Sequence, residues 1–250
     1  MNQRSFNPFS NTPAVTKNLI IINALFWLAT IIMTKLDLTE MLGLHYPLSK
    51  GFRLYQIISY MFMHGSLSHL FFNMFAVYMF GRTLESVWGS KRFLSFYMIT
   101  GIGAGLVNLL VAYLRIRAVE AELSPDMITE IYREGYGIFR QGMNYTDPAS
   151  GQLNILINTV TVGASGAVFG ILLAFGMLFP NMQLYIIPFP FPIKAKYMVM
   201  GYGLIELFSG FAEIRGDNVA HFAHLGGMLF GIIIVLYWRK KDRNNGTYSY

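Results

Sequence analysis

A serine and a histidine, distant in the sequence, each stand in a glycine-containing stretch of an apolar segment. Ser165 lies in the sequence GASG at 163–166, and His224 lies in the sequence AHLGG at 223–227. A neutral imidazole within ~3 Å of a serine hydroxyl can take its proton and make the oxygen a nucleophile. The two stretches predict serine-based hydrolysis, provided that the fold brings them together.

Glycine spacing indicates how the two segments can approach each other. Gly166 and Gly170 recur at the i, i+4 spacing, and so do Gly227 and Gly231. This spacing lets membrane helices pack closely. Helix packing alone would also explain these glycines, so they predict proximity and not chemistry.

His224 has a competitor for the role of general base in His221, one turn earlier. We favour His224 because it shares a helix side with Gly227. Ser165 is expected to begin its helix, where free backbone N–H groups suit a negative oxygen. Gly163, two residues before Ser165, has no side chain and therefore leaves the backbone there open to close approach.

A second polar pair, His69 and Asn73, has the spacing of one helix face. Both side chains can donate hydrogen bonds, and near Ser165 they could hold the oxyanion of a tetrahedral intermediate. A buried pair without chemistry is the alternative. His64 is expected to be structural.

Composition places these residues in a membrane. The 250 residues are 54% hydrophobic and 13% charged, and none is cysteine; soluble domains are nearer 25% charged. Missing cysteine excludes disulfides and cysteine nucleophiles. The chain has no HExxH sequence and no pair of intramembrane aspartates, which disfavours zinc and aspartyl proteases. We expect no metal, no cofactor and no nucleic-acid partner.

Apolar runs predict an all-α polytopic membrane protein with six spans, since about 20 apolar residues cross a bilayer. The runs cover 19–33, 67–80, 93–114, 164–179, 197–212 and 219–238. The second and fourth are short and carry polar residues. We therefore expect both in the bundle centre, away from lipid.

Charged residues predict the orientation. With the N-terminus inside, the inside segments carry only two acids, Glu85 and Asp242. Their bases are Arg4, Lys17, Arg82, Lys91, Arg92, Lys194, Lys196, Arg239, Lys240, Lys241 and Arg243. This is the positive-inside pattern. It predicts a cytoplasmic segment 1–18, a membrane domain 19–238 and a cytoplasmic tail 239–250, and we expect a bacterial inner (plasma) membrane.

Two long segments lie outside in this topology. The segment 35–66 is expected to be half-embedded in the membrane interface. The insertion 115–163 contains Ser124, Pro125 and Asp126, a sequence typical of a helix start. A short amphipathic helix is predicted there because apolar residues share one helical face. They are Met127, Ile128, Ile131 and Tyr132.

Taken together, the motifs resemble those of the rhomboid family of intramembrane serine proteases. The matching stretches are HGSLSHLFFN at 64–73, the loop 85–89, GASG, and AHLGG followed by Gly231, in the family's order. The likeness runs from about residue 51 to 235.

The resemblance implies a six-helix rhomboid-like bundle and a catalytic dyad, with Ser165 as nucleophile and His224 as base. The oxyanion hole would comprise His69, Asn73 and the Ser165 N–H. The partners would be single-span membrane-protein substrates in the lipid bilayer. Phe169 stands where the family often has a tyrosine that stacks on the catalytic histidine.

A second difference from the family lies in the first outside loop. Tyr55 and Gln56 stand where the family often has Trp-Arg, which leaves the anchoring of that loop open. The sequence leaves two alternatives to a protease open. A catalytically inactive rhomboid-like protein would bind membrane clients, although such relatives usually lack the serine or histidine. A transporter or channel would carry charged or broken helices at mid-membrane, where Glu206 is the one hint.

Overall fold

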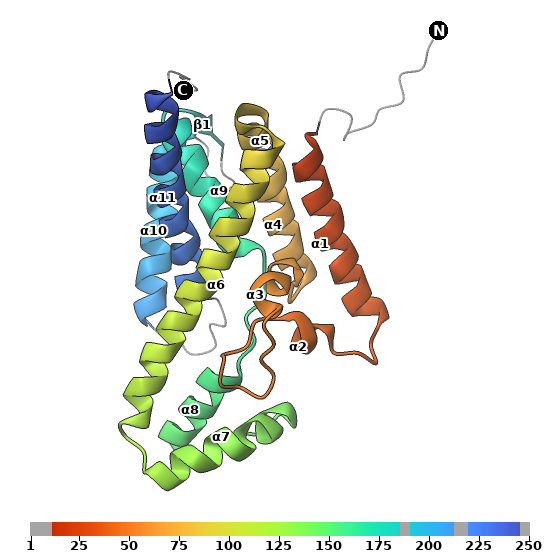
Figure 1. Ribbon diagram of the computed structural model, residues 1–250, viewed down its shortest axis with the longest axis vertical. Coiled ribbons are helices and arrows are strands. Elements are labelled where there is room, and N and C mark those ends of the chain that lie inside the picture. The colour runs from red at the N-terminus through yellow and green to blue at the C-terminus, as the bar shows by residue number, and fades with distance from the viewer. Residues whose placement is uncertain (1–11, 186–190, 213–219, 246–250) are drawn as a thin grey trace.

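The computed structural model describes residues 12–185, 191–212 and 220–245, and this part is almost entirely helical (Figure 1). Helical segments coincide with all six predicted spans. They are α1 (Ala14–Ile32), α4 (Leu67–Ala76) continued by the π-helical turn η2 (Val77–Gly81), α6 (Ser90–Glu120), α9 (Ser165–Leu178), α10 (Ala195–Ala212) and α11 (His221–Asn244). The predicted six-helix membrane bundle is confirmed.

Several helices extend beyond their predicted spans. α1 begins at Ala14, α6 continues to Glu120, and α11 continues to Asn244. The first residues of the insertion (115–120) and of the C-terminal tail (239–244) are therefore helical. Lys and Arg are good helix formers, so a helix continues into water where its apolar run ends. By length and composition α1, α6 and α11 can each cross a membrane, and α9 is a shorter apolar helix.

α9 lies at the centre of the bundle, as expected, with nearly every residue of 166–176 buried. The same expectation is wrong for α4. Its outer face exposes half or more of Leu67, Phe71, Phe72 and Phe75. The polar residues of α4 occupy one face only, so the opposite face can border lipid.

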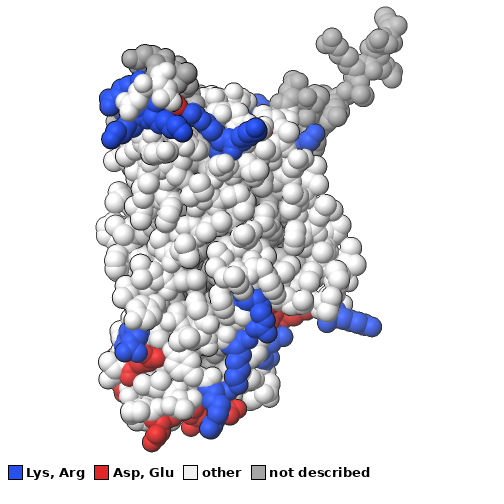
Figure 2. All heavy atoms as spheres, viewed as in Figure 1, with Lys and Arg blue, Asp and Glu red and all other residues white. Residues whose placement is uncertain are grey.

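Charge divides the molecule into zones (Figure 2). A broad uncharged band separates two charged ends. The end where α1 begins and α11 finishes carries mostly Lys and Arg, whereas the end formed by α7 (Pro125–Arg140) and α8 (Pro148–Asn158) carries both signs. This distribution agrees with the residues assigned to the two sides from the sequence.

The predicted amphipathic helix of the insertion is α7. Ser124 Oγ accepts a hydrogen bond from the Met127 N–H at 3.3 Å, which caps the helix. Its apolar face packs on α8 around the buried side chains of Ile131 and Leu153. This small core is separate from the main one and covers the C-terminal end of α6.

Short elements complete the described chain. They are α2 (Leu38–Leu42), α3 (Gln56–Ser59), the 3-10 helix η1 (Tyr60–Phe62), α5 (Arg82–Trp88), and the antiparallel strands β1 (Gln183–Leu184) and β2 (Ile193–Lys194). At the end of the bundle where α1 begins, the Glu85 carboxylate accepts hydrogen bonds from the N–H groups of Val15 and Thr16 and from the Ser90 hydroxyl. Glu85 thus joins α1, α5 and α6.

Candidate active site

The segment before α9 runs along the bundle and is fixed by the first outside loop (Figure 1). Thr161 and Leu44 form an antiparallel bridge with N–H···O distances of 2.8 and 2.9 Å. The Gly163 N–H then donates to the Tyr60 carbonyl at 2.9 Å. These contacts determine where α9 begins.

Gly163 has a conformation that other residues rarely adopt, with φ of +128°. A β-carbon at this position would lie 2.8 Å from Cε1 and Nε2 of His69 and 3.4 Å from Ser165 Oγ. The glycine therefore lets the His69 ring come close to the serine. Because α9 starts at Ser165, the N–H groups of its first turn have no helical carbonyl partner.

α9 and α11 touch through their glycines. A β-carbon at Gly227 would lie only 1.8 Å from the Gly166 carbonyl oxygen, and one at Gly170 would lie 3.1 Å from the Gly227 oxygen. A β-carbon at Gly231 would lie 3.4 Å from the Gly170 Cα. The two backbones can approach this closely only where side chains are missing, and the approach sets the start of α9 beside the first turn of α11.

Ser165 and His224 meet at this crossing. The serine Oγ lies 2.8 Å from Nε2 of the histidine, which is 8% exposed. Phe169, one turn along α9, stacks on the imidazole with ring centroids 4.2 Å apart. The contact expected from the sequence is present, and the stacking holds the ring with Nε2 toward the hydroxyl.

α4 directs a row of polar side chains inward. Ser66 caps the helix by accepting from the His69 N–H at 3.1 Å. Asn73, 5% exposed, has an Nδ2 group without a hydrogen-bond partner in the described chain. The buried His64 packs edge-on against His69 with ring centroids 5.0 Å apart. An unpaired buried donor on the same helix face as His69 suits an oxyanion hole, and that role stays a prediction for His69 and Asn73.

The sequence indicated no role in hydrolysis for Glu206 and only a rival base in His221, although the structure places both at the site. The Glu206 carboxylate oxygen Oε2 is 2.6 Å from Nδ1 of His221 and 3.0 Å from Nδ1 of His224. The ligand atoms of these three residues lie within 4.8 Å of one another, a spacing at which they could hold a divalent cation. The signal in the sequence was an acid inside an apolar span, which is costly unless paired.

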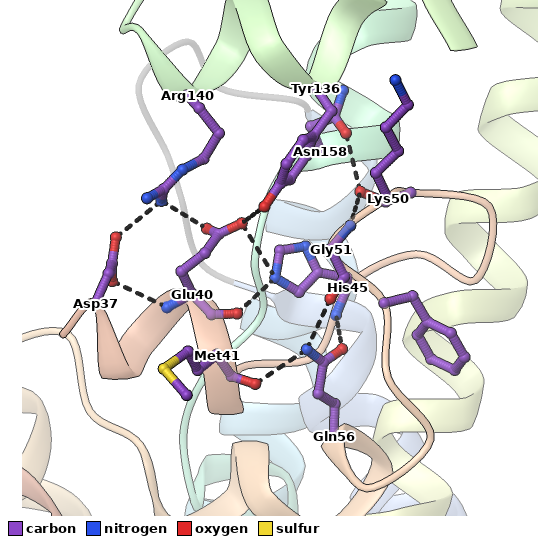
Figure 3. Close-up of polar contacts among 12 residues, drawn as sticks. Asp37, Glu40, Met41, His45, Lys50, Gly51, Gln56, Tyr136, Arg140 and Asn158 are labelled. Carbon is purple, nitrogen blue, oxygen red and sulfur yellow. Dashed lines mark hydrogen bonds and ion pairs between the residues drawn. The ribbon is translucent and has the colours of Figure 1, made fainter. Parts of the chain in front are cut away.

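The first outside loop is anchored by Gln56, which is fully buried (Figure 3). Its side-chain oxygen accepts from the Arg53 N–H at 3.0 Å, and its amide group donates to the carbonyls of Met41 and Gly51. The neighbouring Tyr55 hydroxyl also donates to Met41. Tyr55 and Gln56 therefore anchor the loop, although they replace the Trp-Arg pair that the family often has there.

The insertion braces the same loop from outside (Figure 3). Arg140 of α7 pairs with Asp37 at 2.8 Å and with Glu40 at 3.1 Å, and the Tyr136 hydroxyl donates to Glu40 at 2.8 Å. The Arg140 hydrogen bond holds the pKa of the Asp37 carboxyl below its usual value. Since the loop in turn fixes the segment before Ser165, the insertion supports the site from a distance.

Comparison with known proteins gives one family. The Rhomboid domain model matches residues 51–241. Rhomboid protein 1, mitochondrial, of Saccharomyces cerevisiae is 27% identical over 184 residues, or 74% of this chain and 42% of the yeast protein. RHOMBOID-like protein 12, mitochondrial, of Arabidopsis thaliana is 29% identical over 181 residues, or 71% of this chain and 44% of the plant protein. Rhomboid protease AarA of Providencia stuartii is 27% identical over 232 residues, or 88% of this chain and 71% of that protein.

The chain spans less than half the length of the yeast and Arabidopsis relatives just described. Their names place them in mitochondria, and a further Arabidopsis relative is named chloroplastic. The expectation of a bacterial inner membrane is therefore not supported, while integral membrane location is. The family model covers most of the chain and every motif of the candidate site. The chain belongs to the rhomboid family.

Proposed function

We propose that this protein is an intramembrane serine endopeptidase that hydrolyses peptide bonds in or near the transmembrane segments of single-span membrane proteins. One observation carries the proposal: Ser165 Oγ and His224 Nε2 are 2.8 Å apart. The relative from Providencia stuartii is named a protease, which agrees with this chemistry.

The proposed reaction begins when the Ser165 oxygen attacks the scissile carbonyl and His224 Nε2 takes the hydroxyl proton. His69, Asn73 and the Ser165 N–H donate hydrogen bonds to the resulting oxyanion. The imidazolium then protonates the departing amine, which leaves an acyl-enzyme. A water molecule, deprotonated by the same imidazole, hydrolyses the acyl-enzyme and restores the serine.

The geometry favours His224 over His221 as the base. The His221 Nδ1 group faces Glu206 at 2.6 Å, whereas His224 directs Nε2 at the serine. His224 also carries the stacked Phe169 ring, which restricts its orientation. We therefore place His221 beside the base and do not assign it the role of the base.

A substrate helix must unwind before it can react. Helical carbonyls are already hydrogen-bonded, and the bilayer core offers no replacement partners. The proposed substrates therefore carry small or helix-breaking residues near the cleaved bond.

The test is cleavage of a single-span substrate by purified protein in liposomes. We expect cleavage by wild type and by Ser95→Ala, an exposed serine on α6, and none by Ser165→Ala or His224→Ala. His221→Ala should retain part of the activity. Full cleavage by Ser165→Ala would exclude the nucleophile. Wild type that binds the substrate without cutting it would instead indicate an inactive, client-binding protein.

The same proposal places both termini in the cytoplasm and the insertion 115–163 outside. It is supported by the basic end at which α1 begins and α11 finishes (Figure 2). The chain has no cysteine, so single cysteines introduced by Ser5→Cys and Ser124→Cys can be labelled one at a time. An impermeant maleimide on intact cells should label position 124 only, and the reverse pattern would invert the topology.

A further inference from the structure

Glu206 is the acid that the proposed dyad leaves unused. It lies on α10 inside the bundle and is 8% exposed. A carboxylate inside a membrane protein is costly unless it is paired. In the described chain its polar contacts are the imidazoles of His221 and His224, both through Nδ1.

We propose that Glu206 is a positioning residue for His224, which makes the site a line of serine, imidazole and carboxylate. The inference rests on the proposed function, in which Ser165 and His224 are the catalytic pair. Glu206 touches neither substrate nor serine, and acts only through the histidine.

The tautomer of His224 determines whether its Nε2 can act as a base. Nε2 can accept the Ser165 proton only if the neutral ring carries its own proton on Nδ1. A carboxylate 3.0 Å from Nδ1 favours that tautomer, because a carboxylate accepts hydrogen bonds and cannot donate one when ionised. After proton transfer the same negative charge stabilises the imidazolium. Serine hydrolases of other folds use a buried carboxylate in this way.

His221 fixes the carboxylate itself. Its Nδ1 group lies 2.6 Å from the Glu206 oxygen that also faces His224. One oxygen therefore receives two imidazoles, and His221 restricts the Glu206 side chain to the orientation that reaches the base. This assigns His221 a part in the site that differs from its earlier candidacy as base.

The Nδ1 contact has a suitable length but a poor direction. Although Glu206 Oε2 is 3.0 Å away, Nδ1 of His224 has no well-aligned hydrogen-bond partner in the described chain. Catalytic hydrogen bonds are often misaligned in the absence of substrate and tighten in the complex. The two atoms are already 3.0 Å apart, so the proposal requires only that the carboxylate align with Nδ1 when substrate binds.

The kinetic test compares Glu206→Gln with Glu206→Asp on the single-span substrate. Glutamine keeps the size and loses the charge, so kcat should fall by at least about tenfold with KM nearly unchanged. Aspartate is shorter but keeps the charge, and it should be the more active variant. A packing role would give the opposite order. Glu122→Gln, an exposed glutamate between α6 and α7, is the matched control and should equal wild type.

The pH profile gives a second readout. The titratable groups that face His224 in the described chain are Glu206 from α10, His221 from its own helix and His69 from α4. Removing the one negative charge among them should move the acid limb of the kcat profile to lower pH in Glu206→Gln. An unmoved limb together with wild-type kcat would overturn the proposal.

A third readout does not need activity. Nitrogen-15 histidine spectra of the Ser165→Ala protein, with the His224 signal assigned by its loss in His224→Ala, should show the Nδ1–H tautomer. Glu206→Gln should mix the tautomers, and an unchanged ratio would contradict the positioning role. If wild type fails to cleave but Glu206→Gln changes the tautomer ratio of His224, the proposed function fails and the positioning of His224 by Glu206 stands.

A chelator separates positioning from metal binding by the same three ligands. Activity should be the same with and without EDTA. Loss of activity in EDTA, restored by Zn²⁺, would replace the proposal with a metal site.

Discussion

The Phe169 ring lies face to face with the imidazole of His224, with centroids 4.2 Å apart and planes 7° apart. A flat aromatic surface at this distance prevents rotation of the imidazole while leaving both of its nitrogens at the ring edge. One of these nitrogens faces Ser165 and the other faces Glu206. The stacking partner therefore orients the proposed base without using either polar position.

Phe169 variants should separate stacking from hydrogen bonding. Phe169→Tyr should retain kcat because it keeps the ring. Phe169→Leu should lower kcat between about twofold and tenfold, the range expected for losing an aromatic pair. Cleavage assays in liposomes provide the measurement, with Phe208→Leu, a strongly exposed phenylalanine on α10, as control. Equal activity of Phe169→Leu and wild type would show that stacking does not position the base.

The glycine contact between α9 and α11 should be intolerant of a methyl group. Gly227→Ala would place a β-carbon 1.8 Å from the Gly166 carbonyl oxygen, so the helices must separate. A displacement near 1 Å at a catalytic pair can cost about 10²-fold in rate, and we expect a loss of that order with a lower Tm. Gly201→Ala on α10 meets nothing within 4 Å and should leave both unchanged. Wild-type activity in Gly227→Ala would mean that the close approach is not needed.

Asn73 should affect turnover more than binding. Asn73→Ala removes a buried donor with no other hydrogen-bond partner in the described chain. If this group holds the oxyanion, kcat should fall about 10²–10³-fold while KM changes little. Asn18→Ala, at an exposed position on α1, is the control and should equal wild type. A change confined to KM would assign Asn73 to substrate binding instead.

The contact between Arg140 and Asp37 should make the insertion sensitive to acid. The guanidinium lowers the pKa of the Asp37 carboxyl, so the contact is stabilising above the usual pKa of an aspartate, about 3.9. That contribution is lost as the pH falls through the lowered folded-state value. Both side chains are about half exposed, so the effect is small.

Limited proteolysis of the insertion at different pH values measures this effect. Arg140→Ala should raise the cleavage rate near neutral pH and reduce its acid dependence. Arg133→Ala removes an exposed arginine from the same helix, where its partner is the adjacent Glu134, and should resemble wild type. If Arg140→Ala and Arg133→Ala behave alike, the ion pairs of Arg140 do not help to hold the insertion.

Much of the fold was predictable because its signals are local. Apolar runs of membrane length define the helices, and Ser124 with Pro125 defines the start of α7. The end of α11 at Asn244 was not predictable, because a helix can continue beyond its apolar run. The exposure of α4 was also missed, since a polar residue shows which face is inward but not what borders the other face.

The sequence by itself determined the membrane class and the six helices and singled out the proposed serine and histidine, because residue types and their spacing carry that information. The tertiary structure alone decided that Glu206 on α10 reaches His224 on α11, since contacts between helices depend on crossing geometry and rotamers that no local pattern encodes. It also decided that Gln56 anchors the outer loop and that the insertion braces it. Residues distant in the sequence meet there through the packing of the whole bundle.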